Sequence, residues 1–446
     1  MDIEESEIIL AQSKKIDLLE QKVVDLLDII EKMKVKKGSH NSSLPPSSDI
    51  VPKKKSVRGV STKKTGGQKG HKGSTLEMSE TPDKIIPLKS NFCAKCGSII
   101  ESETFTLKAK RQVIEIPIPK PVIEEYQQYS CTCSTCEHVQ VADFPKNVSA
   151  PIQYGSSVET LVSYYSVYQY VPFKRLQNMF SHVFSLPLSQ GSVANILERA
   201  SQKATGFYEK IKEEIIKSKV VGSDETGVKV NGKNQWVWVW QNASNTYIET
   251  SENRGFETIN RVFENGLPNS TLISDRWAAQ LKTITFDNQI CLAHLIRDVT
   301  YLIELEKHDF SSDFKDLLVN IFEHKRTILT NQKAYKVGSI EAKELETKLN
   351  LALSIIIDPL KHPKTHTFQK SMLKNRNFIL PCIYDLDIPP DNNGSERAIR
   401  NIKVKQKISG QFMSGQSYFC IIRSVIDTLM KRECDIFPSL SQIFAI

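Results

Sequence analysis

The sequence contains no long apolar run. Nowhere along its 446 residues does it approach the roughly 20 consecutive apolar residues that cross a membrane. Its acidic beginning, Met1-Asp-Ile-Glu-Glu5, also lacks the basic and then apolar pattern of a secretion signal. These two absences argue against a membrane partner and against export, and we expect the protein in the cytoplasm.

Neither sign of charge is in large excess. The 59 Lys and Arg residues face 51 Asp and Glu residues, and the net charge of +8 only weakly suggests a polyanionic partner. A chain of 446 residues is too long for one ordinary hydrophobic core, and its 40% of apolar residues can fill two or more. We therefore expect a multidomain globular protein.

Acidic residues are absent from one short basic segment. It lies inside residues 38–84, which are rich in turn formers and which we expect to be a flexible linker. Its eight cations are Lys53, Lys54, Lys55, Arg58, Lys63, Lys64, Lys69 and Lys72. This composition is typical of an arm that neutralises DNA phosphates, although a solvated linker fits equally well.

An apolar heptad repeat occupies residues 7–35. One core position holds Ile9, Ile16, Val23 and Ile30, the other holds Leu19, Leu26 and Met33, and only Gln12 breaks the pattern. Branched residues at the first position and leucines at the second favour a parallel two-stranded coiled coil. The segment therefore predicts a homo-oligomer, and the alternative is one amphipathic helix packed on its own chain.

The nine cysteines are not expected to form disulfides, because a chain without an export signal stays in a reducing compartment. Two pairs, Cys93 with Cys96 and Cys133 with Cys136, have the spacing that lets two thiolates reach one tetrahedral ion. They predict a structural Zn²⁺ site in a small β-rich module at residues 85–145. Cys131 is a competing ligand, and a redox pair is the alternative reading. The remaining cysteines, which are Cys291, Cys382, Cys420 and Cys434, are expected in the core.

From residue 150 the pattern is helical and then mixed. Residues 150–219 predict helices, one capped by Ser189, that either read a DNA groove or, as we favour, pack on the protein. Residues 220–300 predict three hairpin-linked strands, a helix and a fourth strand, the first part of a mixed α/β sheet. Residues 301–378 predict an all-helical insertion, and residues 379–446 the rest of the core with C-terminal helices.

Two aspartates, Asp224 and Asp275, each end a predicted strand. Side chains there emerge into the crevice that α/β folds use for ligands, although a lone aspartate in such a position is more often a turn residue.

A third acid, Glu396, opens a helix that we expect to begin near Ser395. Arg400, Lys403 and Lys407 follow it on one stripe of that helix. Such an arrangement lets an acid bind metal while cations hold phosphates, and an ordinary surface helix is the alternative.

Six segments occur in an order typical of one family. They are Asn41-Ser-Ser-Leu-Pro-Pro-Ser-Ser-Asp49, Gly66-Gly-Gln-Lys-Gly-His-Lys-Gly73, Asp224-Glu-Thr-Gly227, Ser274-Asp-Arg-Trp277, Cys291-Leu-Ala-His-Leu-Ile-Arg297 and Asp391-Asn-Asn-Gly-Ser-Glu-Arg397. From about residue 7 to its last residue, the sequence resembles the insertion-sequence-66 family of transposases, the TnpC-type proteins.

The resemblance implies a bacterial, nucleoid-associated enzyme that binds insertion-element ends and cleaves and joins DNA. It implies a ribonuclease-H-like core in which Asp224, Asp275 and Glu396 form an Asp-Asp-Glu triad that holds Mg²⁺ or Mn²⁺. The cysteine module then matches the family's zinc-binding domain and the heptads its zipper, and accessory proteins of the same element are further partners. The extra Cys131 departs from the pattern and leaves the zinc ligand set open.

Several roles stay open at this stage. Arg397, Arg400 and Lys403 are our candidates for holding DNA strands. Cys291 and His294, which follow a predicted strand, fit both an active-site role and a place in the core. The alternatives for the whole protein are a decayed DNA-binding regulator and a nuclease that cuts without joining.

Overall fold

The computed structural model describes residues 3–38, 40–42, 76–100, 105–331, 339–413 and 415–445. The basic segment from Lys53 to Lys72 lies outside these residues. No helix in the described part of the chain is long and apolar enough to cross a membrane.

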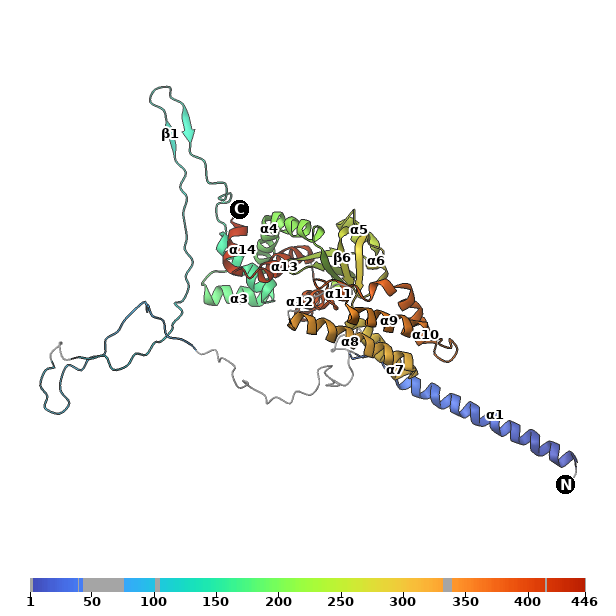
Figure 1. Cartoon of the computed structure of the whole chain (residues 1–446). Helices are drawn as coiled ribbons and strands as arrows, with labels where there is room; N and C mark the ends of the chain where they lie inside the picture. Colours follow the sequence, from blue (N-terminus) through green and yellow to red (C-terminus); the bar gives the residue numbers. More distant parts are fainter. Residues whose placement is uncertain are drawn as a thin grey trace.

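The chain begins with a long helix, α1 (Ile3–Lys34), which projects from the body of the protein near α7 (Figure 1). Its heptad residues are solvent-exposed, with Ile16, Leu19 and Val23 all more than half accessible. The seam from Ile16 to Met33 is thus exposed in the described residues, although Glu31 of the helix pairs with Lys307 (2.9 Å). The coiled coil and the single packed helix both stay predictions.

The described residues between 85 and 145 form a long extended segment that projects from the helices and the sheet (Figure 1). Their described part contains only two three-residue strands, β1 (Ser130–Thr132) and β2 (Val139–Val141), which pair antiparallel. The β-rich zinc module predicted here is not confirmed and stays a prediction. Alternating residues such as Ile116 and Val122 are more than four-fifths exposed, because no second layer of described structure covers them.

A helical region follows, made of α2 (Ser156–Ser163), the π-helix η3 (Tyr164–Tyr168), α3 (Phe173–Val183) and α4 (Gln190–Ile216). The predicted cap is present, because the Ser189 side chain accepts a hydrogen bond from Ser192 N. Leu176 and Phe180 of α3 are fully buried, so this face of α3 packs on the protein core.

The central sheet has the order β5-β4-β3-β6-β7. Its strands are β3 (Val220–Val230), β4 (Lys233–Gln241), β5 (Thr246–Ser251), β6 (Leu267–Ser274) and β7 (Thr285–Ile290). The first three form antiparallel hairpins, and β3, β6 and β7 run parallel, so the predicted mixed α/β architecture is confirmed. Helices α5 (Phe256–Val262) and α6 (Ala278–Leu281) flank β6 in sequence.

Turn chemistry explains the first hairpin. Asn231 and Gly232 both have positive φ, 46° and 77°, as the tight turn between β3 and β4 requires. One strand boundary was predicted wrongly, because β3 continues to Val230 and Asp224 lies inside it. What ends near Asp224 is the pairing of β3 with β6, while the pairing with β4 continues.

Two hydrophobic cores support this sheet. The helices α7 (Leu292–Glu306), α8 (Asp309–Asn331), α9 (Ile340–Ser354), α10 (Pro363–Lys374) and α11 (Pro381–Tyr384), with the 3₁₀ turn η4 (Arg376–Phe378), surround one core. The other core joins the sheet to α4 and to α12 (Asn393–Ser409), α13 (Gln416–Lys431) and α14 (Ile436–Phe444). The long helical segment is thus inserted between β7 and α12.

Candidate active site

Parallel pairing of β3 and β6 brings two aspartates to the same place. Gly222 pairs with Ile273. Asp224 lies two residues after Gly222 inside β3, and Asp275 lies two residues after Ile273, just past the end of β6. Continuing this register sets the two aspartates side by side where β6 ends. Glu225 N donates to Asp224 Oδ1 (2.8 Å), whereas Asp275 Oδ1 is buried without a hydrogen-bond partner.

The start of α12 is docked directly on β3. The Asn392 side chain, at the helix N-cap, donates to Ser223 O (2.7 Å) and accepts from Ser395 Oγ (2.7 Å). The approach requires glycine on the strand, because a Cβ at Gly222 would lie 2.7 Å from both Asn392 Oδ1 and Ser395 Oγ. This contact brings Glu396, in the first turn of α12, to the edge of the sheet where the aspartates lie.

His294 and Arg297 of α7 connect the acids. His294 Nε2 lies 3.6 Å from Asp275 Oδ2, and its Nδ1 lies 3.7 Å from Glu396 Oε1. Arg297 contacts both partners, through Nη1 to His294 Nε2 (3.1 Å) and Nη2 to Glu396 Oε1 (3.2 Å). Because a guanidinium can only donate, His294 Nε2 is the acceptor and Nδ1 carries the proton facing Cys291 Sγ (3.2 Å).

Negative charge is concentrated here. Burial, and then the charges of Asp275, Glu225 and Glu396, hold the pKa of Asp224 well above its usual range. Burial also raises the pKa of Glu225, although the Arg254 guanidinium pairs with that carboxylate (2.5 Å). Carboxylates this close together favour a proton or a cation between them.

The thiol at this site is not reactive. Burial raises the pKa of Cys291 to about 12, so its sulfur is neutral at physiological pH and is not a nucleophile. It accepts from Asn392 N (3.3 Å) and thereby ties the start of α7 to the start of α12. Of the two roles considered for Cys291, the structure favours a buried structural one beside the acids.

Oxygen donors of this kind suit a hard divalent cation such as Mg²⁺. Within the described residues, however, no three His, Cys, Asp or Glu side chains are gathered closely enough to form a ready set of metal ligands. The acids are near enough to influence the pKa of Asp224, but the Arg297 guanidinium lies on Glu396.

The cations predicted to hold DNA differ in exposure. Arg397 and Arg400 are exposed on α12, as is Lys407. Lys403 is half-buried, donates from Nζ to Gly227 O (2.6 Å), and its pKa is lowered by burial. Of the three predicted cations on α12, Arg397 and Arg400 are therefore exposed, while Lys403 already has a protein partner.

Each cysteine pair forms its own tight turn. Gly97 N donates to Cys93 O, and Glu137 N donates to Cys133 O, both at 2.9 Å. The hydrogen bond with Ser98 lowers the pKa of Cys96 to about 7, and backbone hydrogen bonds at Thr135 and Cys136 do the same for Cys133. The two turns are not brought together into a four-cysteine set within the described chain.

The other cysteines were predicted largely correctly. Cys291, Cys382 and Cys420 are buried as expected. Cys434 is exposed, against the prediction, because it lies in the short connection between α13 and α14 rather than on a packed face.

Sequence reasoning missed three charged residues. Glu225 and Arg254 form an ion pair at the edge of the cluster, and Arg297 holds Glu396. Arg297 could have been found, because it stands three residues after His294 and so on the same face of a helix. No local signal in the sequence joins Arg254 to Glu225.

The fold and the acidic cluster define the chain as a mixed α/β protein with a carboxylate-rich site at one edge of its sheet. The family described as "Transposase IS66 family" matches residues 151–417, which contain the whole sheet and all three acids. The chain therefore belongs to the IS66 family of transposases.

The "Family of unknown function (DUF6444)" matches residues 2–77. No curated protein matches the chain. Membership of the IS66 family implies a transposase role, with DNA binding and DNA cleavage, and transposases typically use divalent metal ions.

Proposed function

We propose that this protein is a DNA transposase with a ribonuclease-H-like core, which binds the ends of an insertion element, cleaves there and joins the freed 3′-hydroxyl to target DNA. The observation that supports the proposal is that His294 lies 3.6 Å from Asp275 Oδ2 and 3.7 Å from Glu396 Oε1, and that both acids raise the pKa of Asp224, within the segment that matches the transposase family. Its partners are then element ends and target DNA in the bacterial nucleoid, with accessory proteins of the element as further candidates.

Asp224, Asp275 and Glu396 are the proposed ligands of Mg²⁺ or Mn²⁺. When bound, the metal ions would make a water or a 3′-hydroxyl more nucleophilic and offset charge on the phosphate. Support comes from the buried Asp275 Oδ1 without a partner and from the raised pKa of Asp224, since both favour a cation.

His294 and Arg297 are proposed to hold Glu396 before DNA binds. The Arg297 guanidinium offsets the carboxylate charge while no metal is present, and it becomes free to contact a DNA phosphate once Glu396 turns toward the aspartates. His294 keeps its Nδ1 proton toward Cys291, so its Nε2 remains an acceptor at this site. Arg397 and Arg400 are exposed on the same helix as Glu396 and are proposed to hold the DNA strands.

The decisive experiment combines DNA binding, cleavage and joining. We expect Asp224→Asn, Asp275→Asn and Glu396→Gln each to abolish cleavage and joining of end DNA while binding persists. Glu252→Gln, which removes an exposed acid just after β5, is the matched control and should remain active.

Other outcomes of the same experiment point to the two alternatives. A parent protein that cuts but never joins is a nuclease, and one that binds end DNA without cutting is a regulator. Near-normal joining by any one acid variant removes that residue from the proposed triad.

Three parts of the chain outside the core have proposed roles. The exposed seam of α1 is proposed to pair with a second copy in a coiled coil. Cys93, Cys96, Cys133 and Cys136 are proposed to bind one structural Zn²⁺, supported by two similar turns with low thiol pKa values. The basic segment from Lys53 to Lys72 is proposed to contact DNA phosphates.

A further inference from the structure

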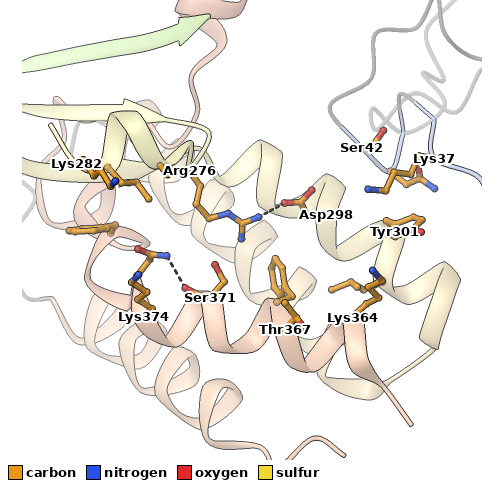
Figure 2. Close-up of a pocket in the computed structure, with 17 residues that line it drawn as sticks. Lys37, Ser42, Arg276, Lys282, Asp298, Tyr301, Lys364, Thr367, Ser371 and Lys374 are labelled. Atoms are coloured by element: carbon orange, nitrogen blue, oxygen red, sulfur yellow. Dashed lines mark hydrogen bonds and ion pairs between the residues drawn. The ribbon is translucent and has the colours of Figure 1, made fainter. Parts of the chain in front are cut away.

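A basic cleft of about 800 Å³ adjoins the acidic cluster (Figure 2). One side is α10, and the other side consists of α7 and the connection from β6 to α6. The chain just after α1 lies at its rim, with Lys37, Asn41 and Ser42. None of the described residues considered above for DNA binding lines it.

The lining carries a strong excess of positive charge. Its cations are Lys37, Arg276, Lys282, Lys364 and Lys374, and its single acid is Asp298. Asp298 is already paired with Arg276 (2.9 Å). No described carboxylate forms an ion pair with any of the four lysines, although Lys37 lies over the Tyr301 ring.

The Arg276 guanidinium is only partly hydrogen-bonded. Its Nη2 is bound to Asp298, but its Nη1 is buried and has no hydrogen-bond partner. A buried guanidinium nitrogen without an acceptor is costly unless a ligand supplies one. An anion with several oxygens, such as a phosphodiester, would meet this demand and offset the lysine charges.

The same two elements, the end of β6 and α7, carry residues of both the cleft and the acidic cluster. Arg276 directly follows Asp275, and α7 directs His294 and Arg297 to the acids while Asp298 and Tyr301 line the cleft. The cleft therefore begins one residue from Asp275, a proposed metal ligand.

The chain just after α1 is held at this rim. The His40 and Asn41 side chains contact Glu304 of α7, at 3.1 Å and 2.6 Å.

We propose that this cleft binds the sugar-phosphate backbone of DNA immediately beside the phosphate that reacts. The proposal rests on the proposed transposase function and adds a DNA-binding surface to it. Lysines bind phosphate as point charges without reading bases, so the cleft contributes affinity and positioning rather than sequence recognition.

The test compares two triple variants of the full chain that lose the same charge. Lys282→Gln, Lys364→Gln and Lys374→Gln together remove lysines of the cleft. Lys343→Gln, Lys348→Gln and Lys370→Gln together remove exposed lysines of α9 and α10 that do not line it. Binding of end DNA and of an unrelated duplex is measured as a function of salt concentration, and thermal unfolding checks that each variant is folded.

Each phosphate contact contributes about 0.9 to the slope of log affinity against log salt, so the cleft variant should lose about 2.7 of the slope on both DNAs. Between about 50 and about 200 mM salt, the parent should then lose about 40-fold more affinity than the cleft variant. The control triple should keep the parental slope. If the cleft triple does not fold, Lys374→Gln alone should lower the slope by about 0.9.

An unchanged slope in the cleft variant, or equal losses in both triples, overturns the proposal. A parent that binds DNA yet neither cuts nor joins it contradicts the transposase function alone, because the salt slopes still decide whether the cleft holds DNA. A parent that binds no DNA contradicts both.

Discussion

Replacement of Gly222 by alanine tests whether the docking of α12 on β3 positions the third acid. The new Cβ would lie 2.6 Å from Gln241 Nε2 and 2.7 Å from both Asn392 Oδ1 and Ser395 Oγ. Ordinary contacts start near 3.4 Å, so these groups must retreat by about 0.7 Å. Gln241 is long enough to move, but the buried Asn392 is held by its hydrogen bond to Ser223 O.

The expected cost has two parts. Crowding of a packed contact costs about 1–3 kcal/mol, and a buried group that loses its hydrogen bond costs about 1–3 kcal/mol more. The smaller entropy of an unfolded chain with alanine returns about 0.4–1 kcal/mol. We therefore expect Gly222→Ala to lower the free energy of unfolding by about 1–6 kcal/mol.

Activity should fall as well, because Glu396 moves with the start of α12. A displacement near 1 Å at a reacting centre costs about 100-fold in rate, and that is the loss we expect in DNA cleavage at saturating DNA.

Gly227→Ala is the matched control on the same strand, since the nearest atoms to its new Cβ are Trp236 ring carbons at 3.9 Å. It should be as active as the parent. Equal stability and cleavage rates for Gly222→Ala and Gly227→Ala would refute the argument that this glycine sets the position of Glu396.

Three further predictions concern charge, assembly and metal. Because the folded state holds the Asp224 proton more tightly than the unfolded chain, stability should fall as pH rises from the usual carboxyl range through the raised pKa. Asp224→Asn should remove that fall in chelator-treated protein, and parallel stability profiles for variant and parent would contradict this. Leu19→Lys with Leu26→Lys should reduce the mass in light scattering to that of one chain, whereas Leu18→Lys, outside the seam, should not. Protein purified without chelator should contain about one Zn²⁺ per chain, lost in Cys93→Ser and kept in Cys131→Ser, and zinc-free parent protein would contradict the site.

Local sequence signals predicted the elements of the core well. The Asn231-Gly232 turn, the Ser189 cap and the first turn of α12 depend on neighbouring residues, and the structure contains all three. The positions of the acids relative to the strands were predicted less well, because Asp224 lies inside β3 rather than at its end.

The features that the sequence could not predict depend on contacts between residues that are far apart in the chain. Strand β3 continues past Asp224 because it stays paired with β4 after its pairing with β6 has ended. The residue pattern of one strand does not tell which neighbouring strand remains paired with it. The apolar alternation at residues 105–126 likewise does not tell whether a second layer exists to cover it. The contact of Arg254 with Glu225 joins two separate elements and has no local signature.

The contact between Asn392 and Ser223 forms late during synthesis of the chain. The two residues are 169 positions apart, and everything between them, including the helical insertion, leaves the ribosome first. Closing so long a segment has an entropy cost that only the completed packing offsets, so this contact belongs to the late steps of folding. Until α12 is synthesised and docked, Asp224 and Asp275 stand without Glu396. The unfinished chain thus carries two of the three proposed metal ligands but not the third.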